Sequence, residues 1–187
     1  RHTLCPFMGE PATAFGKFVV MLDTSLDVSS AAAQVDIGAV VREQLAHLIF
    51  PLISCDALTF ERFASKLHVE IHRLAAEAGN KSPPVHAAFH PTMEGDAKSK
   101  PRFVGVMRRA PDPFVQFVPV GLQKGGSTFI DPRTVDLTAL AAEMKANPVQ
   151  TTFKRMVPDH LDEMLETMAD IHAQRDQSYA RFLDVLA

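Results

Sequence analysis

Runs of apolar residues along the chain follow two patterns, one typical of strands and one typical of helices. Short runs rich in β-branched and aromatic residues predict strands over residues 15–22, 85–90, 103–108 and 114–118. A further apolar run over residues 49–54, interrupted by Pro51, is a candidate for a short strand. Turn-forming residues separate these runs, as is usual where strands end.

Four other segments carry apolar residues at intervals of three and four, which predicts helices. They cover residues 31–48, 56–78, 136–147 and 158–186. Ser29 or Ser30 would cap the first helix, and Asp56 or Thr59 the second. Pro158 suits the first position of the last helix, because the first N–H of a helix has no partner within it.

Strands and helices interleave along the chain, without an internal repeat or an evident domain boundary. This order favours a single α+β domain over residues 1–187, with helices packed on a mixed sheet of about four to five strands in two layers. Residues 158–186 would form a long C-terminal helix. A chain of 187 residues is long enough to bury its own core.

Composition narrows the class of protein. The chain is 47% hydrophobic and 22% charged, which is ordinary for a globular protein, and its net charge is −3. The absence of a basic block argues against nucleic-acid binding. No apolar stretch reaches the roughly 18 residues that span a bilayer. With two cysteines and no signal-peptide pattern, we expect a cytoplasmic protein with reduced thiols and no membrane partner.

The candidate chemistry centres on His90, which ends an apolar run and precedes Pro91. A titratable side chain at a strand end combines rigid support with access. The imidazole would serve as a metal or haem ligand or as a general base. The alternative is a histidine that only bonds the nearby backbone. His86 lies on the same strand face, but about 13 Å away, so we expect it to support the site rather than share an ion with His90.

Cys5 and three arginines extend the candidate site. The Cys5 thiolate would be a nucleophile or a metal or haem ligand, and otherwise a small buried residue. Arg102, Arg108 and Arg109 carry guanidinium groups, which suit a substrate carboxylate. On a strand, Arg108 and Arg109 would point to opposite faces, and we favour Arg109 as the one at the site. The alternative is that Arg109 forms a structural ion pair with an aspartate such as Asp112.

Two other motifs are set aside. His68 and His72 lie four positions apart on a predicted helix, a spacing that can chelate a metal from one side. The apolar stripe of that helix places them at its edge and towards solvent, so a solvated face is the favoured interpretation. The glycine-containing run over residues 121–127 lacks the Gly-Lys-Ser/Thr order of a phosphate-binding loop, which argues against nucleotide binding.

Several short motifs resemble those of a small bacterial family known as domain of unknown function 1415. Leu4-Cys5-Pro6-Phe7 is similar to the family's Leu-Cys-Pro-Phe, and Phe89-His90-Pro91 to its Phe-His-Pro. Residues 109–113 occupy the place of its Arg-Ser-Pro-Tyr-Pro, and Val157-Pro158 that of an Ile-Pro before the last helix. Gly105 and Arg108 replace two asparagines of the family. The resemblance covers roughly residues 1–170 and implies that Cys5, His90 and Arg109 share one site. It implies no activity.

Three hypotheses about function follow. The leading one is an oxidoreductase that binds haem or non-haem iron through His90 and Cys5 and orients a carboxylate-bearing small molecule through Arg109. The second is a metal-free enzyme that uses Cys5 and His90 in acid–base or thiol chemistry. The third is a non-catalytic ligand-binding or dimerisation module. Its C-terminal helix would pack on a second copy of the chain through Met164, Met168 and Ile171.

Overall fold

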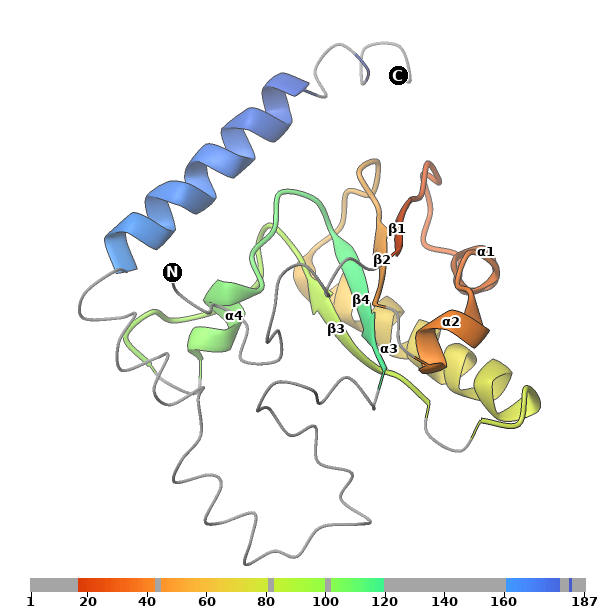
Figure 1. The fold of residues 1–187 in the computed structure, drawn as a ribbon. Coiled ribbons are helices and arrows are strands. Elements are labelled where there is room, and N and C mark those ends of the chain that lie inside the picture. The colour runs from red at the N-terminus through yellow and green to blue at the C-terminus, as the bar shows by residue number, and fades with distance from the viewer. Residues whose placement is uncertain are drawn as a thin grey trace, which may run out of the picture.

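Four strands form one open, mixed sheet in a computed structural model of the chain (Figure 1). The structure describes residues 17–42, 45–80, 83–99, 102–119, 161–178 and 182. The strands are β1 (Lys17–Val20), β2 (Ala46–Ile49), β3 (Val85–Phe89) and β4 (Phe114–Val118). Their order in the sheet is β1-β2-β4-β3, with β1 parallel to β2 and β4 antiparallel to both of its neighbours.

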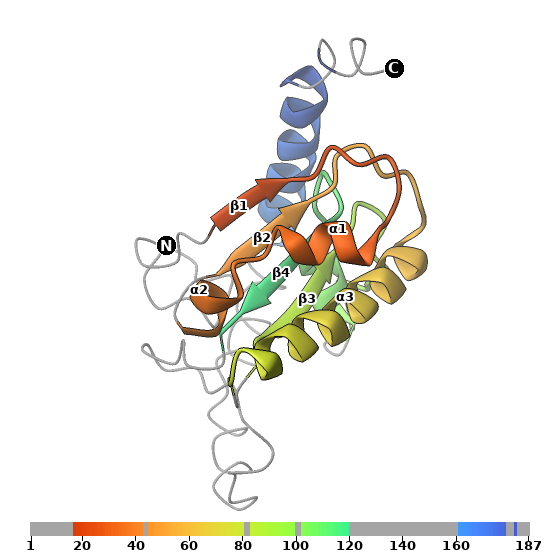
Figure 2. The ribbon, with the colours of Figure 1, turned by 90° about the vertical axis from the view of Figure 1, so that its right-hand side faces the viewer.

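Helices lie on both sides of this sheet. The four labelled helices are α1 (Val28–Ala33), α2 (Ile37–Arg42), α3 (Ala57–Glu77) and α4 (Phe103–Met107), and residues 161–178 are also helical. Helices α1, α2 and α3 cover one face (Figure 2). Helix α4 and the helix over residues 161–178 lie on the opposite side. The fold is therefore α+β, as the sequence predicts.

Helix α3 supplies most of the helical side chains that pack on the sheet in the main core. The Asp56 carboxylate caps it by accepting a 2.8 Å hydrogen bond from the Thr59 backbone N–H. Gly79, with a φ of 79°, follows its end in the left-handed region that favours glycine. The apolar stripe of α3 is buried against the inner residues of the sheet, so the predicted helix and its cap are confirmed. Members of this core include Phe60, Phe63, Ala64, Leu67, Ile71, Leu48, Val115 and Phe117.

A second, smaller core forms where α4 meets the helix over residues 161–178. Phe103 and Val106 of α4 are buried with Met164, and Met168 packs against them. Met164 and Met168, which the dimerisation hypothesis places against a second copy, thus pack within the chain. Ile171 is 47% exposed. A homodimer stays a prediction.

A buried ion pair attaches the helix over residues 161–178 to the turn before β4. The Nε and Nη2 atoms of Arg175 lie 2.8 and 2.5 Å from Oδ1 of Asp112. Nη2 also lies 3.4 Å from the Pro51 carbonyl oxygen. The Asp112 side chain is buried, so its charge depends on this guanidinium for compensation. Asp112 is therefore not the partner that the alternative interpretation assigned to Arg109.

The single helix predicted over residues 31–48 was wrong. Helix α1 ends at Ala33, the Asp36 carboxylate then caps α2 through a 3.0 Å bond from the Ala39 N–H, and β2 follows. Strand β2 is central and mostly buried, so its apolar residues do not alternate with polar ones. The short strand suggested over residues 49–54 lies earlier in the chain, at β2.

The strand predicted over residues 103–108 was also wrong, because this segment forms α4. Its β-branched and aromatic residues favour a strand locally, but burial against Met164 places Phe103 and Val106 on one helical face. The other predicted strands, over residues 15–22, 85–90 and 114–118, are confirmed as β1, β3 and β4.

Other predictions fall outside the described residues. These concern Cys5, residues 121–127 and the helix over residues 136–147. Of the last predicted helix, residues 161–178 are described and helical. Among the helices that the structure describes, none is both long and apolar enough to cross a membrane.

Replacement of Gly105 by alanine should destabilise the protein. A Cβ at this position would overlap the carbonyl oxygen of Glu94, whose backbone passes directly over α4. We expect Gly105→Ala to lower the free energy of unfolding by about 1–3 kcal/mol, measured by urea denaturation. Val104→Ala on the same helix is the control, because Val104 is 53% exposed and should change stability by about 0.5 kcal/mol or less. Equal effects of the two variants would contradict the close packing at Gly105.

Removal of the Asp112 carboxylate should also destabilise the fold. Asp112→Ala removes the buried carboxylate that pairs with the partly buried Arg175 guanidinium, and we expect a loss of about 2–4 kcal/mol by urea denaturation. Asp176 contacts the same guanidinium at 3.0 Å, but its side chain is 72% exposed. Asp176→Ala should therefore cost about 1 kcal/mol or less. A cost for Asp176→Ala as large as that for Asp112→Ala would show that burial does not set the strength of the pair.

Candidate functional site

His90 is buried at the end of β3, where its ring joins two parts of the fold. Its Nδ1 atom accepts a hydrogen bond from the Thr92 backbone N–H at 3.2 Å and lies 3.0 Å from the Thr92 hydroxyl. The backbone of Cys55, just before α3, also lies near the ring and favours its protonated form. Because Nδ1 accepts, the ring proton of the neutral form lies on Nε2, which is the atom left to donate.

The environment of His90 favours the neutral imidazole. Burial lowers the pKa of His90, while the Cys55 backbone and the charge of Asp56 oppose this shift. The ring of Phe60 packs beside it, with 5.8 Å between ring centroids. The geometry thus resembles the alternative that the sequence left open, a histidine that bonds nearby backbone.

The backbone of His90 brings the two central sequence motifs together. The His90 N–H donates to the Arg108 carbonyl oxygen at 3.1 Å, so Phe89-His90-Pro91 lies beside Arg108 and Arg109. The His90 carbonyl oxygen in turn accepts from the Met93 N–H at 3.0 Å. The first bond holds the segment after β3 against the segment before β4, and the second closes the turn over residues 90–93.

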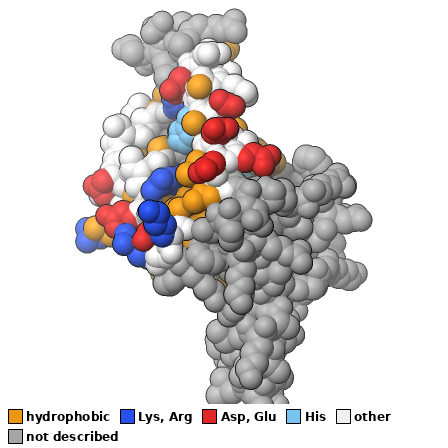
Figure 3. Space-filling model, turned by 90° about the vertical axis from the view of Figure 1, so that its left-hand side faces the viewer, with side chains coloured by type: hydrophobic (Ala, Val, Ile, Leu, Met, Phe, Trp, Pro, Cys, Tyr) orange, Lys and Arg blue, Asp and Glu red, His pale blue; other side chains and the backbone are white. Residues whose placement is uncertain are grey.

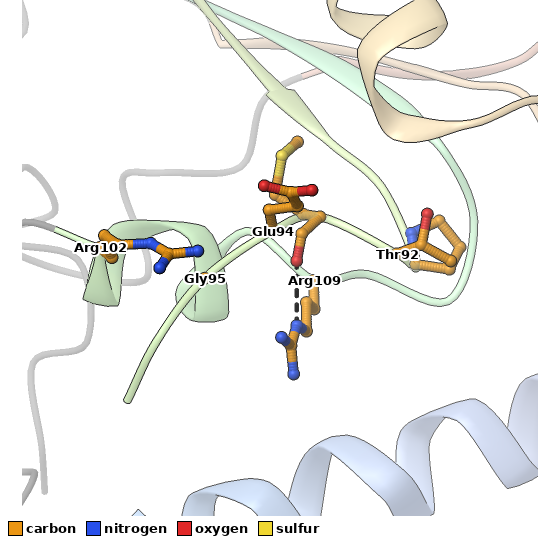
Figure 4. Close-up of a pocket in the computed structure, with 7 residues that line it drawn as sticks. Thr92, Glu94, Gly95, Arg102 and Arg109 are labelled. Atoms are coloured by element: carbon orange, nitrogen blue, oxygen red, sulfur yellow. Dashed lines mark hydrogen bonds between the residues drawn. The ribbon is translucent and has the colours of Figure 1, made fainter. Parts of the chain in front are cut away.

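An open pocket of about 290 Å³ lies next to this junction (Figure 4). Its lining residues come from the turn after β3 and from both ends of α4: Pro91, Thr92, Met93, Glu94, Gly95, Arg102 and Arg109. The sequence pointed to Arg102 and Arg109, but not to Thr92 or Glu94. Only their place after His90-Pro91 could have suggested them.

Two guanidinium groups give the pocket its chemical character. The Nε–H of Arg109 donates to the Met93 carbonyl oxygen at 3.1 Å, which fixes the base of the guanidinium and leaves its two terminal nitrogens for another partner. In Figure 4 the Glu94 carboxylate points away from Arg109. Within the described residues, neither Arg102 nor Arg109 forms an ion pair with an acidic side chain. Figure 3 shows basic side chains gathered on this side of the molecule, beside acidic and hydrophobic ones.

Arg108 serves a different part of the structure. It follows α4 as its C-cap, and its charge helps to lower the pKa of His86. Arg108 and Arg109 thus act on different groups, as predicted. They lie at the end of a helix, however, and not on the predicted strand. Arg102 and Arg109 line the pocket, and Arg108 does not.

His68, His72 and His86 form a cluster between α3 and the start of β3. The ring centroid of His68 lies 4.0 Å from that of His72 and 4.2 Å from that of His86. The Nε2 atoms of His68 and His72 lie 3.0 and 3.2 Å from the same Pro84 carbonyl oxygen. The solvated face predicted for His68 and His72 was therefore wrong, because the chain before β3 returns along this edge of α3 and half-buries both rings.

Cys55 is the one cysteine within the described residues, and its thiol is free. Burial raises its pKa, and the charge of Asp56 adds to this effect, so the thiol form is favoured. Among the residues that the structure describes, no three or more His, Cys, Asp or Glu side chains form a group suited to hold a metal ion.

Fold and site together define an α+β protein with an open, arginine-lined pocket beside a buried histidine. Comparison with protein-family models, with curated proteins and with solved structures finds no match for this chain. The resemblance to the domain of unknown function 1415 family stays a prediction.

The histidine cluster should make stability depend on pH. Burial, together with His68 and Arg108, lowers the pKa of His86 to about 4, below its usual 6.5. Unfolded chains therefore take up a proton first, and the free energy of unfolding should fall as the pH drops from about 6.5 towards 4. We expect a loss of about 1–2 kcal/mol, because solvent screens the half-buried ring. Urea denaturation at several pH values in EDTA measures it. His86→Phe should flatten the dependence, and an unchanged slope would contradict this origin.

Proposed function

We propose that the protein binds a small carboxylate-bearing molecule in the pocket lined by Arg102 and Arg109. The observation that carries this proposal is the pair of guanidinium groups that share one pocket without an acidic partner in the described part of the chain. A volume of about 290 Å³ suits a small metabolite, at the lower end of the roughly 300–1,000 Å³ found for small-molecule sites.

Arg109 is the better-positioned anchor of the two. Its hydrogen bond to the Met93 carbonyl oxygen restrains the guanidinium before a ligand arrives, so less conformational entropy is lost on binding. The free edge of a guanidinium matches the two oxygens of a carboxylate. Arg102 adds positive charge from the other end of α4.

Thr92 and Glu94 suggest what else the ligand carries. Both lie in the same pocket as the arginines. A carboxylate such as that of Glu94 accepts hydrogen bonds from hydroxyl or amino groups and repels a second anion. A hydroxy acid or amino acid therefore suits this pocket better than a ligand whose polar groups are all anionic.

His90 enters this proposal as a positioning residue. Its hydrogen bonds to Thr92 fix the turn that forms one wall of the pocket. Haem- or iron-dependent oxidation with His90 as ligand stays a prediction, as does thiol chemistry at Cys5. A metal bound at Nδ1 of His90 would have to displace its hydrogen bond from the Thr92 N–H.

Substitution of Arg109 tests the proposal. Isothermal titration with L-lactate, a small hydroxy acid with a single carboxylate, should show binding to the unmodified chain. Arg109→Gln should weaken it about tenfold or more, because a charge-assisted hydrogen bond contributes about 1.5–3 kcal/mol. Arg109→Lys keeps the charge but not the fork and should be intermediate.

The matched control is Arg62→Gln, which removes an equal charge from the exposed face of α3. It should leave L-lactate binding unchanged. Equal losses for Arg62→Gln and Arg109→Gln would reduce the effect to net charge, and would contradict a site at the pocket.

A further inference from the structure

The histidine cluster between α3 and β3 contains two imidazoles whose ring nitrogens approach one point. The Nε2 atoms of His68 and His72 lie 3.0 and 3.2 Å from the Pro84 carbonyl oxygen. A carbonyl only accepts, so each ring directs its Nε2–H at the same oxygen. The two Nε2 atoms, one helical turn apart, are thus already directed at one shared acceptor.

This convergence is what a metal chelate requires. Residues four apart on a helix lie on one face, so two histidines at this spacing can bind one ion from the same side. Each ring can carry its proton on Nδ1 instead of Nε2. Both Nε2 lone pairs then face the space beside the Pro84 carbonyl oxygen, where a metal ion can bind. The Pro84 carbonyl then moves aside or becomes an oxygen ligand.

We propose that His68 and His72 bind a first-row divalent cation at the junction of α3 and β3, with water and the Pro84 carbonyl oxygen as the remaining ligands. Imidazole nitrogen suits Cu²⁺, Ni²⁺ and Zn²⁺, and the order of stability places Cu²⁺ first. The bound ion would connect the middle of α3 to the chain that enters β3. This site is separate from the arginine-lined pocket and does not depend on its function.

The surroundings set the affinity of the site. The His86 ring packs on His68 and supports its orientation, but the described residues offer no third His, Cys, Asp or Glu side chain placed for the same ion. A site of two imidazoles binds more weakly than a closed structural zinc site, which has four protein ligands.

Titration with Ni²⁺, followed by isothermal calorimetry in a non-chelating buffer, tests the site. Substitution of a ligand should matter more than that of its neighbours. His68→Gln and His72→Gln should each lower the affinity about tenfold or more, whereas His172→Gln, on the helix over residues 161–178, should not change it. Glutamine can still donate to the Pro84 carbonyl, so both ligand variants should fold, as far-UV circular dichroism will show. Affinity equal to that of the unmodified chain in both ligand variants would overturn the proposal.

One further measurement does not depend on the ligand variants. Electron paramagnetic resonance of the Cu²⁺ complex should show coupling to two imidazole nitrogens, and a spectrum without nitrogen coupling would overturn the assignment.

Discussion

The buried imidazole of His90 is the contact on which the candidate site depends. Through Nδ1 it holds Thr92 in the turn after β3, and its ring packs beside Phe60 of α3. Its own backbone N–H pairs with Arg108 on the segment that leads to β4. One side chain and its peptide group thus join three segments that are distant in sequence. The bonds to Thr92 are partly shielded from water, which favours one position of the turn that lines the pocket.

Close packing between two backbone segments also fixes the shape of the pocket. The chain at Glu94 and Gly95 crosses α4 so tightly that neither Gly95 nor Gly105 has room for a Cβ atom. This crossing brings Arg102 and Arg109, at the two ends of α4, to one pocket. The helix over residues 161–178 then covers the other side of α4 through Met164. Helix α4 is therefore held between two surfaces, which explains how so short a helix can position two long side chains.

How far the sequence predicts the structure depends on how local each cause is. Helix α3 could be predicted because its cap and apolar stripe lie within the segment, and β4 because it is rich in β-branched and aromatic residues. Helix α4 was missed, since Met164, on which its apolar face packs, lies far along the chain. Similarly, the motifs placed Arg109 near His90, but the histidine cluster was missed. The spacing of His68 and His72 was visible, whereas the carbonyl of Pro84 reaches them only through the fold.

The two ends of β3 carry different chemical groups. At its C-terminal end, Arg109 is restrained by a carbonyl and presents charge to an open pocket, where an anion gains most. At its N-terminal end, the Nε2 atoms of His68 and His72 meet at the carbonyl oxygen of Pro84, where a cation would gain most. Arg109 lines the pocket and is not part of the histidine cluster, so its loss should act only on the anion. Loss of His68 or His72 should act only on the cation, and the two kinds of substitution therefore separate the sites.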